Sequence, residues 1–345
     1  MHAQKAMSHT RLGKTNLQVS RTAFGALPIQ RTPLKEAVAI LHRAYDAGIN
    51  FYDTARYYTD SESKLGAAFG DGRRSAIILA TKSGATTADG LRADLETSLR
   101  NLKTDYVDLL QLHNPAQLYA PDDPASPLYA MLEAQRQGKV RFVGITNHSI
   151  ERARGAVLST HYDTVQFPLS ALSDTRDLEL ISLCQQHDVG LIAMKALAGG
   201  LLAQARIAFA FLRQFEHVVP IWGIQRMEEL EEFIQLEADP PHLDDAMRQA
   251  IEKDKAELGS SFCRGCGYCM PCPEGINISW LARMPLMLRR APTHVYLSPE
   301  WQAQMEKVKN CRDCGLCRAK CPYALDTPAL LRTALADYAT FLSAP

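Results

Sequence analysis

Residues 311–322 read Cys-Arg-Asp-Cys-Gly-Leu-Cys-Arg-Ala-Lys-Cys-Pro, and this spacing determines what the C-terminal part of the chain can fold around. A C-x2-C-x2-C-x3-C-P run supplies four thiolates for iron–sulfur ligation. Residues 263–273 read Cys-Arg-Gly-Cys-Gly-Tyr-Cys-Met-Pro-Cys-Pro, one residue shorter before the fourth cysteine. The two runs hold eight of the nine cysteines of the chain. They predict iron–sulfur chemistry near the C-terminus.

The two runs resemble those of two-cluster bacterial-type ferredoxins, in which the fourth cysteine of each run ligates the cluster of the other run. The resemblance implies one 4Fe–4S cluster on Cys263, Cys266, Cys269 and Cys321, and a second on Cys311, Cys314, Cys317 and Cys272. The shortened first run leaves this pairing open. The 38 residues between the runs carry apolar side chains at helical spacing, which is typical of a mostly helical variant.

The cysteine spacing is compatible with two other uses. Paired C-x2-C elements can hold zinc, with four tetrahedral ligands at each site. Disulfides are the other alternative, but the chain has no recognisable secretory signal, so a reducing, cytoplasmic location is expected. The prolines that follow Cys272 and Cys321 favour clusters over both.

Length and composition predict one large domain and one small domain. The chain has 345 residues, which we divide into residues 1–255 and 256–345. It carries 38 basic and 38 acidic side chains, and this balance gives no sign of a nucleic-acid-binding surface. No apolar run approaches the roughly 20 residues needed to cross a membrane. We therefore expect neither nucleic acid nor membrane as a partner.

The first 255 residues alternate β-branched runs with amphipathic helical patterns. The expected strands are Thr22–Leu27, Ile49–Asp53, Ala76–Lys82, Tyr106–His113, Val140–Thr146, Thr164–Phe167, Gly190–Lys195 and His217–Gly223. Eight such repeats predict an α/β fold, a (β/α)8 TIM barrel, followed by the small, mostly helical iron–sulfur domain. A doubly wound sheet is the alternative, but the glycine-rich turn that would support it is not in the sequence.

Polar side chains stand at the ends of several predicted strands. Asp53, Lys82 and His113 end the second, third and fourth strands, and Thr146, Asn147 and Gln166 stand at the ends of the next two. Catalytic groups of a TIM barrel come from the C-terminal ends of its strands. A carboxylate, an ammonium and an imidazole at successive strand ends therefore predict an active site at the barrel mouth.

Several motifs in this region resemble those of the aldo-keto reductase family. Residues 50–58, Asn-Phe-Tyr-Asp-Thr-Ala-Arg-Tyr-Tyr, are similar to the motif that carries its aspartate and tyrosine five residues apart. Ala80–Lys82 and Asp108–His113 are similar to the motifs that carry its lysine and histidine. The resemblance implies NAD(P)H-dependent reduction of a carbonyl, with Asp53, Tyr58, Lys82 and His113 as catalytic residues. Tyr57 is the rival acid, but the spacing selects Tyr58.

The chemistry of these side chains suits hydride addition. The charge that develops on the carbonyl oxygen must be met by a proton or by hydrogen bonds. Tyr58 would be the acid, with a free pKa of about 10 that the Lys82 ammonium is expected to lower. Asp53 would hold Lys82 charged and in place, and His113 would donate a hydrogen bond to the substrate oxygen.

The same resemblance implies a cofactor site. Thr146, Asn147 and Gln166 match residues that bind the nicotinamide carboxamide. Met194, Lys195 and Leu197 follow the seventh strand, where many relatives stack a tyrosine on the ring. The adenosine end would meet Gly223, Gln225, Arg226 and Glu232, and the usual downstream arginine is replaced by Glu229. Arg226 could pair with a 2′-phosphate, so NADPH is expected, with NADH as the alternative.

Three functions remain open from the sequence. The first is an NADPH-dependent reductase of a small-molecule aldehyde or ketone, whose two 4Fe–4S clusters are structural or sense oxygen. The second is an electron-transfer oxidoreductase whose clusters exchange electrons with a partner protein. The third is a catalytically silent, redox-responsive binding module. The complete set of four catalytic side chains favours the first.

Overall fold

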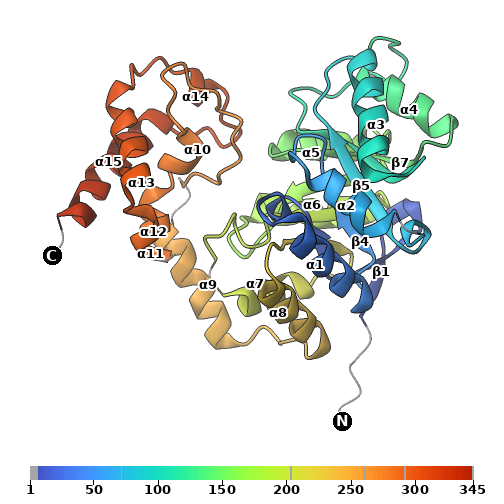
Figure 1. The fold of residues 1–345 in the computed structure, drawn as a ribbon, viewed down its shortest axis with the longest axis horizontal. Helices are drawn as coiled ribbons and strands as arrows, with labels where there is room; N and C mark the ends of the chain where they lie inside the picture. The colour runs from blue at the N-terminus through green and yellow to red at the C-terminus, as the bar shows by residue number, and fades with distance from the viewer. Residues whose placement is uncertain (1–6, 71, 203, 259–261, 291–292, 344–345) are drawn as a thin grey trace. The chain divides into compact units, whose positions relative to one another are not determined.

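The computed structural model describes residues 7–70, 72–202, 204–258, 262–290 and 293–343 (Figure 1). The chain divides into two compact units. The first comprises Met1–Ala196 and Arg206–Leu243, and the second comprises Leu197–Ala205 and Asp244–Pro345. Each unit is described separately below.

The first unit is built on a closed barrel of parallel strands. In barrel order the strands of the described chain are β10 (Val218–Gly223), β3 (Ala23–Gly25), β4 (Phe51–Asp53), β5 (Ile78–Ser83), β6 (Val107–His113), β7 (Val140–Thr146), β8 (Thr164–Pro168) and β9 (Gly190–Met194). All neighbours pair in parallel, and β10 closes on β3. Each of the eight predicted strands overlaps one of these, so the predicted (β/α)8 barrel is confirmed.

Helices follow the strands along the chain, as expected when each buries an apolar stripe against the sheet. They are α1 (Leu34–Asp46), α2 (Ser61–Phe69), α3 (Ala88–Leu102), α4 (Pro127–Arg136), α5 (Ile150–Leu158), α6 (Thr175–Gln186), α7 (Ala205–Arg213) and α8 (Met227–Ala238), with short 3-10 turns at Gly13–Thr15, Pro28–Arg31 and Arg74–Ala76. In α1, Ala37, Ile40, Leu41 and Ala44 are fully or nearly fully buried.

An antiparallel hairpin precedes the barrel and was not among the predicted elements. Its strands are β1 (His9–Arg11) and β2 (Gln18–Ser20). Leu12 and Val19 from this segment are buried in one cluster with barrel residues such as Phe51 and Leu109. The hairpin therefore supplies apolar side chains to the interior of the barrel. Its two strands read His-Thr-Arg and Gln-Val-Ser and are mostly polar, so they lack the apolar run that predicts a strand.

The second unit is mostly helical, as predicted. Its helices are α9 (Asp245–Leu258), α10 (Ile278–Leu281), α11 (Met284–Arg290), α12 (Thr293–Tyr296), α13 (Pro299–Glu306), α14 (Leu316–Ala319) and α15 (Thr327–Leu342), with a 3-10 turn at Lys307–Asn310. The apolar residues expected between the cysteine runs, including Leu281, Met284 and Leu288, are buried in its core. Cys263, Cys269 and Cys317 belong to this same core. The core thus contains thiols as well as hydrocarbon.

Candidate active site and cysteine site

Three consecutive strands of the barrel bring the first three polar residues to the same end. Asp53 ends β4, Lys82 is the fifth residue of β5, and His113 ends β6. Parallel strands place their carboxyl ends together, so these side chains share the mouth of the barrel. Tyr58 lies between β4 and α2 in a turn in which its own N–H donates to the carbonyl of Ala55, at 3.0 Å.

Lys82 and Asp53 form a buried ion pair. The Lys82 Nζ atom lies 2.6 Å from Asp53 Oδ2 and donates to the Thr54 carbonyl at 2.6 Å. The two charged side chains are 1 % and 2 % exposed. Burial raises the pKa of Asp53 and lowers the pKa of Lys82, and the contact between them opposes both shifts. The pair therefore depends on both partners, because either charge alone would be buried without compensation.

Gln111 extends this pair toward the next strands, a role that sequence reasoning missed. Its Nε2 donates to Gln166 Oε1 at 2.9 Å and to Asp53 Oδ1 at 3.3 Å. Gln111 pairs in register with Lys82 on β5, and all of these groups are buried. Strand alternation could have indicated this role, because Gln111 lies two residues before His113 and therefore faces the same side of β6. The amide thus fixes the unpaired side of the Asp53 carboxylate.

Tyr58 and His113 lie directly beside this ion pair. Their rings meet edge to face with centroids 5.8 Å apart, and Lys82 Nζ lies 5.0 Å from the Tyr58 ring centroid. Burial, together with the Lys82 charge, lowers the pKa of His113 to about 3, so its imidazole is neutral at physiological pH. A neutral imidazole can donate one hydrogen bond without carrying a charge.

The pKa of Tyr58 departs from the expectation stated above. Burial raises it, and the Asp53 carboxylate adds to the increase. The prediction that Lys82 lowers the pKa of Tyr58 is therefore wrong. The physical reason is that Asp53 neutralises the ammonium at 2.6 Å, which leaves desolvation as the dominant effect. Tyr58 is fully protonated at neutral pH and can act only as a proton or hydrogen-bond donor.

The rival tyrosine occupies a different environment. Tyr57 is 62 % exposed, and its ring centroid lies 6.5 Å from that of His113. Its ring lies over Gly84, where a Cβ atom would come within 2.5 Å of it. Tyr57 is therefore at the solvent-exposed rim, whereas Tyr58 is half-buried next to Lys82.

The residues expected to bind the nicotinamide carboxamide lie on the next two strands. Thr146 ends β7 and pairs in register with Gln166 on β8. Asn147 is fully buried, and its side chain donates to the Pro115 carbonyl at 3.0 Å and accepts from the Ser149 N–H at 2.9 Å. These polar groups adjoin the Asp53–Gln111–Gln166 network, because Gln166 belongs to both.

The three residues expected beside the nicotinamide ring after β9 are divided between the two compact units. Met194 ends β9 and is half-buried, and Lys195 follows with φ of +57°. Leu197 falls in the second compact unit rather than with the barrel. Its carbonyl accepts from Gly200 N–H at 2.9 Å and from Leu202 N–H at 3.2 Å. The structure thus keeps Met194 and Lys195 at the strand end and assigns Leu197 to the other unit.

The residues expected at the adenosine end surround the start of α8. Gly223 ends β10, and Glu232 is exposed on α8. Glu229 accepts from the backbone N–H groups of Gln225 and Arg226, at 2.9 and 3.1 Å. The Arg226 side chain is 68 % exposed and lies 2.8 Å from Glu229. Glu229 therefore caps the helix and also pairs with the arginine expected to meet a phosphate.

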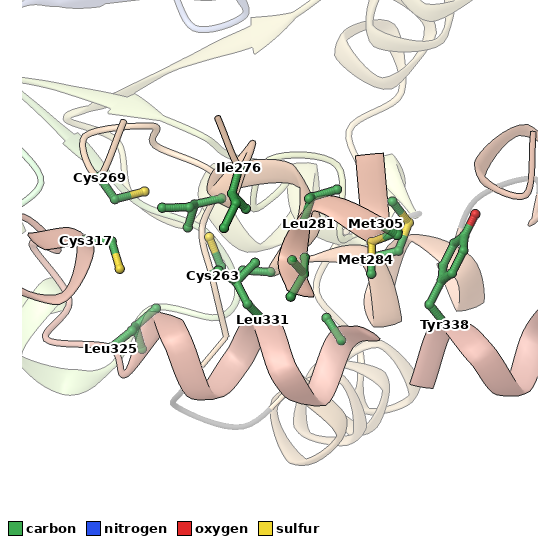
Figure 2. Close-up of a cluster of buried hydrophobic side chains, with 14 of the residues drawn as sticks. Cys263, Cys269, Ile276, Leu281, Met284, Met305, Cys317, Leu325, Leu331 and Tyr338 are labelled. Carbon is green, nitrogen blue, oxygen red and sulfur yellow. The ribbon is translucent and has the colours of Figure 1, made fainter. Parts of the chain in front are cut away.

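Cysteines from the two runs come together in the second unit. Cys269 and Cys272 from the first run line one pocket with Cys311, Cys314 and Cys317 from the second. Figure 2 shows Cys263, Cys269 and Cys317 gathered at one end of the buried cluster, with Tyr338 at the other. All nine cysteines have free thiols. The described side chains form no group of three that would hold a single metal ion.

The last cysteine of each run lies near cysteines of the other run. Cys266 and Cys321 are the thiols that act electrostatically on Cys263, so the last cysteine of the second run lies near the first run. Cys272, the last of the first run, lies with the second run in the pocket. Eight thiols from both runs in one small unit are a donor set that suits iron–sulfur ligation.

Comparison with known proteins identifies the class of this chain. The model of the aldo/keto reductase family matches residues 22–233, and the model of a 4Fe–4S dicluster domain matches residues 262–326. The family match covers more than half of the chain and includes every barrel strand. The chain belongs to the aldo/keto reductase family, and its enzyme class is that of NAD(P)H-dependent oxidoreductases. It also carries a C-terminal 4Fe–4S dicluster domain.

Individual relatives agree with this assignment. L-galactose dehydrogenase of Arabidopsis thaliana is 33 % identical over 211 residues, covering 56 % of this chain and 66 % of that protein. The uncharacterized oxidoreductase YqkF of Bacillus subtilis is 30 % identical, covering 57 % and 67 %. The match thus spans about two thirds of each relative. An aldo-keto reductase of Bacillus halodurans, in its holo form, superposes with a TM-score of 0.62 at 24 % identity, covering 72 % of this chain and 96 % of that structure, and shows the fold.

None of the helices in the described part of the chain is both long and apolar enough to span a membrane.

Proposed function

We propose that this protein reduces an aldehyde or ketone with NAD(P)H, using Tyr58 as the general acid. The observation that carries the proposal is the Lys82–Asp53 contact of 2.6 Å directly beside the half-buried Tyr58 ring. A protonated phenol, a neutral imidazole and a buried ammonium at one strand end are the groups that a developing alkoxide requires. They meet the substrate oxygen with a proton donor, a hydrogen-bond donor and a positive charge.

Each side chain has a separate task in this proposal. Tyr58 gives its hydroxyl proton to the carbonyl oxygen, and its raised pKa keeps that proton in place until charge develops. His113, neutral because its pKa is about 3, donates a hydrogen bond that orients the carbonyl. Lys82 stabilises the tyrosinate that remains, and Asp53 and Gln111 hold Lys82 in position. NAD(P)H supplies the hydride when it is bound.

The cofactor would be held by the side chains around the barrel mouth. The amide and hydroxyl groups of Thr146, Asn147 and Gln166 would bind the carboxamide. Met194 and Lys195 would flank the nicotinamide ring. Gly223, Gln225, Arg226 and Glu232 would meet the adenosine end. The exposed Arg226 supports NADPH over NADH, although its pairing with Glu229 weakens that preference.

We further propose that the eight cysteines bind two 4Fe–4S clusters in the crossed arrangement. The proximity of Cys321 to Cys263, and of Cys272 to the second run, supports this pairing. Zinc remains the alternative, and metal analysis separates the two. Residues 256–345 would form the cluster domain and residues 1–255 the reductase domain. A reducing cytoplasm would keep the thiols free.

One observation favours a second function, electron exchange with a partner protein. Cys314 is exposed, and the neighbouring Leu316 is 50 % exposed. A cluster held there would lie close to the surface, where a one-electron carrier could reach it. The complete ion-pair network in the barrel argues against a catalytically silent binding module.

The central experiment compares Tyr58→Phe with Tyr57→Phe in the full, cluster-replete protein. NADPH oxidation is followed with a panel of aldehydes and ketones. We expect Tyr58→Phe to lower kcat by about 10²–10⁴, while Tyr57→Phe stays near wild type because its hydroxyl lies at the exposed rim. Retained activity in Tyr58→Phe would reject the proposed acid.

A second measurement tests the electron-transfer alternative. NADPH is mixed rapidly with the protein in the absence of any carbonyl, and the visible absorbance of the clusters is followed. An unchanged spectrum supports a self-sufficient carbonyl reductase. Bleaching at a rate comparable to turnover would instead favour electron exchange through the clusters.

A further inference from the structure

Arg283 is a buried cation without an acidic partner among the residues that the structure describes. It lies between α10 and α11 and is 6 % exposed. Its Nη2 donates to the Gly199 carbonyl at 2.6 Å and contacts the Met287 sulfur at 3.7 Å, but its Nε has no hydrogen-bond partner in the described part of the chain. None of the ion pairs between described residues includes it. Burying an unpaired guanidinium costs several kcal/mol, so a compensating negative charge is expected nearby.

The guanidinium lies against the backbone of the first cysteine run. Gly265 has φ of +63°, and a Cβ atom there would come within 2.4 Å of Arg283 Nη1, so only glycine leaves room for it. The Gly265 N–H in turn donates to the Cys263 sulfur at 3.4 Å. Cys263 is the thiol that acts electrostatically on Arg283. The sulfur of Cys263, when it is a ligand, therefore places a negative charge that acts on this cation.

We propose that Arg283 balances the charge of the cluster held at Cys263 and makes it the higher-potential cluster of the two. This inference rests on the proposed pair of 4Fe–4S clusters. Four thiolates give such a cluster a net negative charge, and one-electron reduction makes it more negative. A buried positive charge beside it favours the reduced state, because net charge and surroundings set the potentials of these clusters.

The cations near the second run are placed differently. Arg312 is exposed and pairs with Glu274. Arg318 is also exposed and lies 2.8 Å from Asp326. Charges that are exposed and already paired are largely screened, whereas a buried charge is not. Arg264, half-buried and stacked 4.4 Å from the Tyr323 ring centroid, adds a further positive charge on the side of the first run. The first run therefore has more buried positive charge around it than the second run. This is the difference that would give its cluster the higher potential.

The test is a redox titration of anaerobically purified, full-length protein, with dithionite as reductant and mediators, monitored by electron paramagnetic resonance. Iron and acid-labile sulfide are measured first. Arg283→Gln removes the charge but keeps a hydrogen-bond donor, and Arg283→Lys keeps the charge. Arg289→Gln, an exposed arginine that pairs with Asp337, is the matched control.

In Arg283→Gln we expect a more than tenfold smaller equilibrium constant for reduction of one cluster, equivalent to about 59 mV for a one-electron couple. Arg283→Lys and Arg289→Gln should stay near wild type. Loss of about half of the iron in Arg283→Gln alone would also support the inference, because charge would then decide whether that cluster is held. Unchanged potentials in Arg283→Gln, or equal loss in Arg283→Lys, would overturn it. Zinc without iron in the wild-type protein would instead reject the proposed clusters.

Discussion

The barrel mouth and the cysteine unit both bury charged or ionisable groups, but they compensate them differently. In the barrel, Asp53 compensates the charge of Lys82, and Gln111 donates to the other oxygen of the Asp53 carboxylate. Side chains of the protein thus compensate both buried charges. In the cysteine unit, Arg283 has no carboxylate partner among the described residues. The barrel site is therefore organised before any ligand binds. The cysteine unit contains a buried cation that the proposed clusters would balance.

Removing one partner of the barrel ion pair should have the largest effect. In Lys82→Met, we expect the free energy of unfolding to fall by about 3–5 kcal/mol, because Asp53 is left as a buried, uncompensated charge. Carbonyl reduction should fall at least about 100-fold, since Tyr58 loses the positive charge beside it. Urea unfolding and NADPH oxidation measure the two effects separately.

A double variant separates stability from catalysis at this site. Lys82→Met with Asp53→Asn should recover much of the lost stability but none of the activity. Arg176→Met, which breaks an exposed pair with Glu151, is the control and should cost less than about 1 kcal/mol. If Lys82→Met unfolded at the same urea concentration as wild type, the buried pair would not contribute to stability as argued here.

Removing the metal should affect the other unit. We expect iron chelation to increase amide hydrogen exchange in residues 262–326, because metal binding supplies folding free energy to a unit of short helices. Exchange in the barrel strands and NADPH-dependent carbonyl reduction should change little, since the barrel network needs no metal. Exchange measured by mass spectrometry before and after chelation checks both. Equal exposure of the two units would show that they are not independent in this respect.

The sequence predicted the barrel because the evidence for it is local. Strand alternation, strand-end polar residues and cysteine spacing each extend over a few residues, and the eight strands follow from them. The hairpin of β1 and β2 was missed because its strands are mostly polar and lack an apolar run. The active-site residues were placed by motif, whereas their pKa values required the packed structure.

The missed residues depend on register and on long-range packing. Gln111 meets Asp53 and Gln166 only because β4, β6 and β8 bring their side chains to one level inside the barrel. No sequence pattern distinguishes Arg283 from the other arginines. Its burial without a carboxylate partner among the described residues is visible only in the folded chain, where Gly199 and Gly265 pack against it. Glu229 did leave a local signal, since a glutamate three residues after the residue that precedes a helix is typical of a capping box.

The pH dependence of stability tests the burial of His113. Its pKa is lowered to about 3, against about 6.5 in an unfolded chain. Between these values the unfolded chain binds a proton that the folded protein does not, so the free energy of unfolding falls as pH drops below 6.5. One such group contributes at most about 1.4 kcal/mol per pH unit. We expect His113→Gln to flatten the dependence measured by urea unfolding between pH 4.5 and 6.5.

The control for this prediction is another histidine of the barrel. His161 is exposed, so His161→Gln should leave the slope as it is in wild type. A wild-type slope in His113→Gln would show that folding does not shift the pKa of this imidazole. Burial would then not be what keeps His113 a neutral hydrogen-bond donor in the proposed site.

The smallest effect concerns the helix cap at the adenosine end of the barrel. Glu229 holds the backbone N–H groups of Gln225 and Arg226 and also pairs with the Arg226 side chain. Glu229→Gln keeps an oxygen that can accept from the backbone but removes the negative charge. Arg226 and the N-terminus of α8 would then both be available to a phosphate.

We expect Glu229→Gln to bind NADPH a few-fold more tightly, because an exposed ion pair of this kind contributes at most about 1 kcal/mol. Binding of NADH, which lacks the 2′-phosphate, should change little, and fluorescence titration of both cofactors measures the difference. Glu228→Gln removes the same charge from an exposed neighbouring position and controls for general electrostatics. Equal gains for both cofactors, or the same gain in Glu228→Gln, would mean that the Arg226–Glu229 pair does not discriminate between them. A selective gain in Glu229→Gln would instead place a 2′-phosphate beside Arg226.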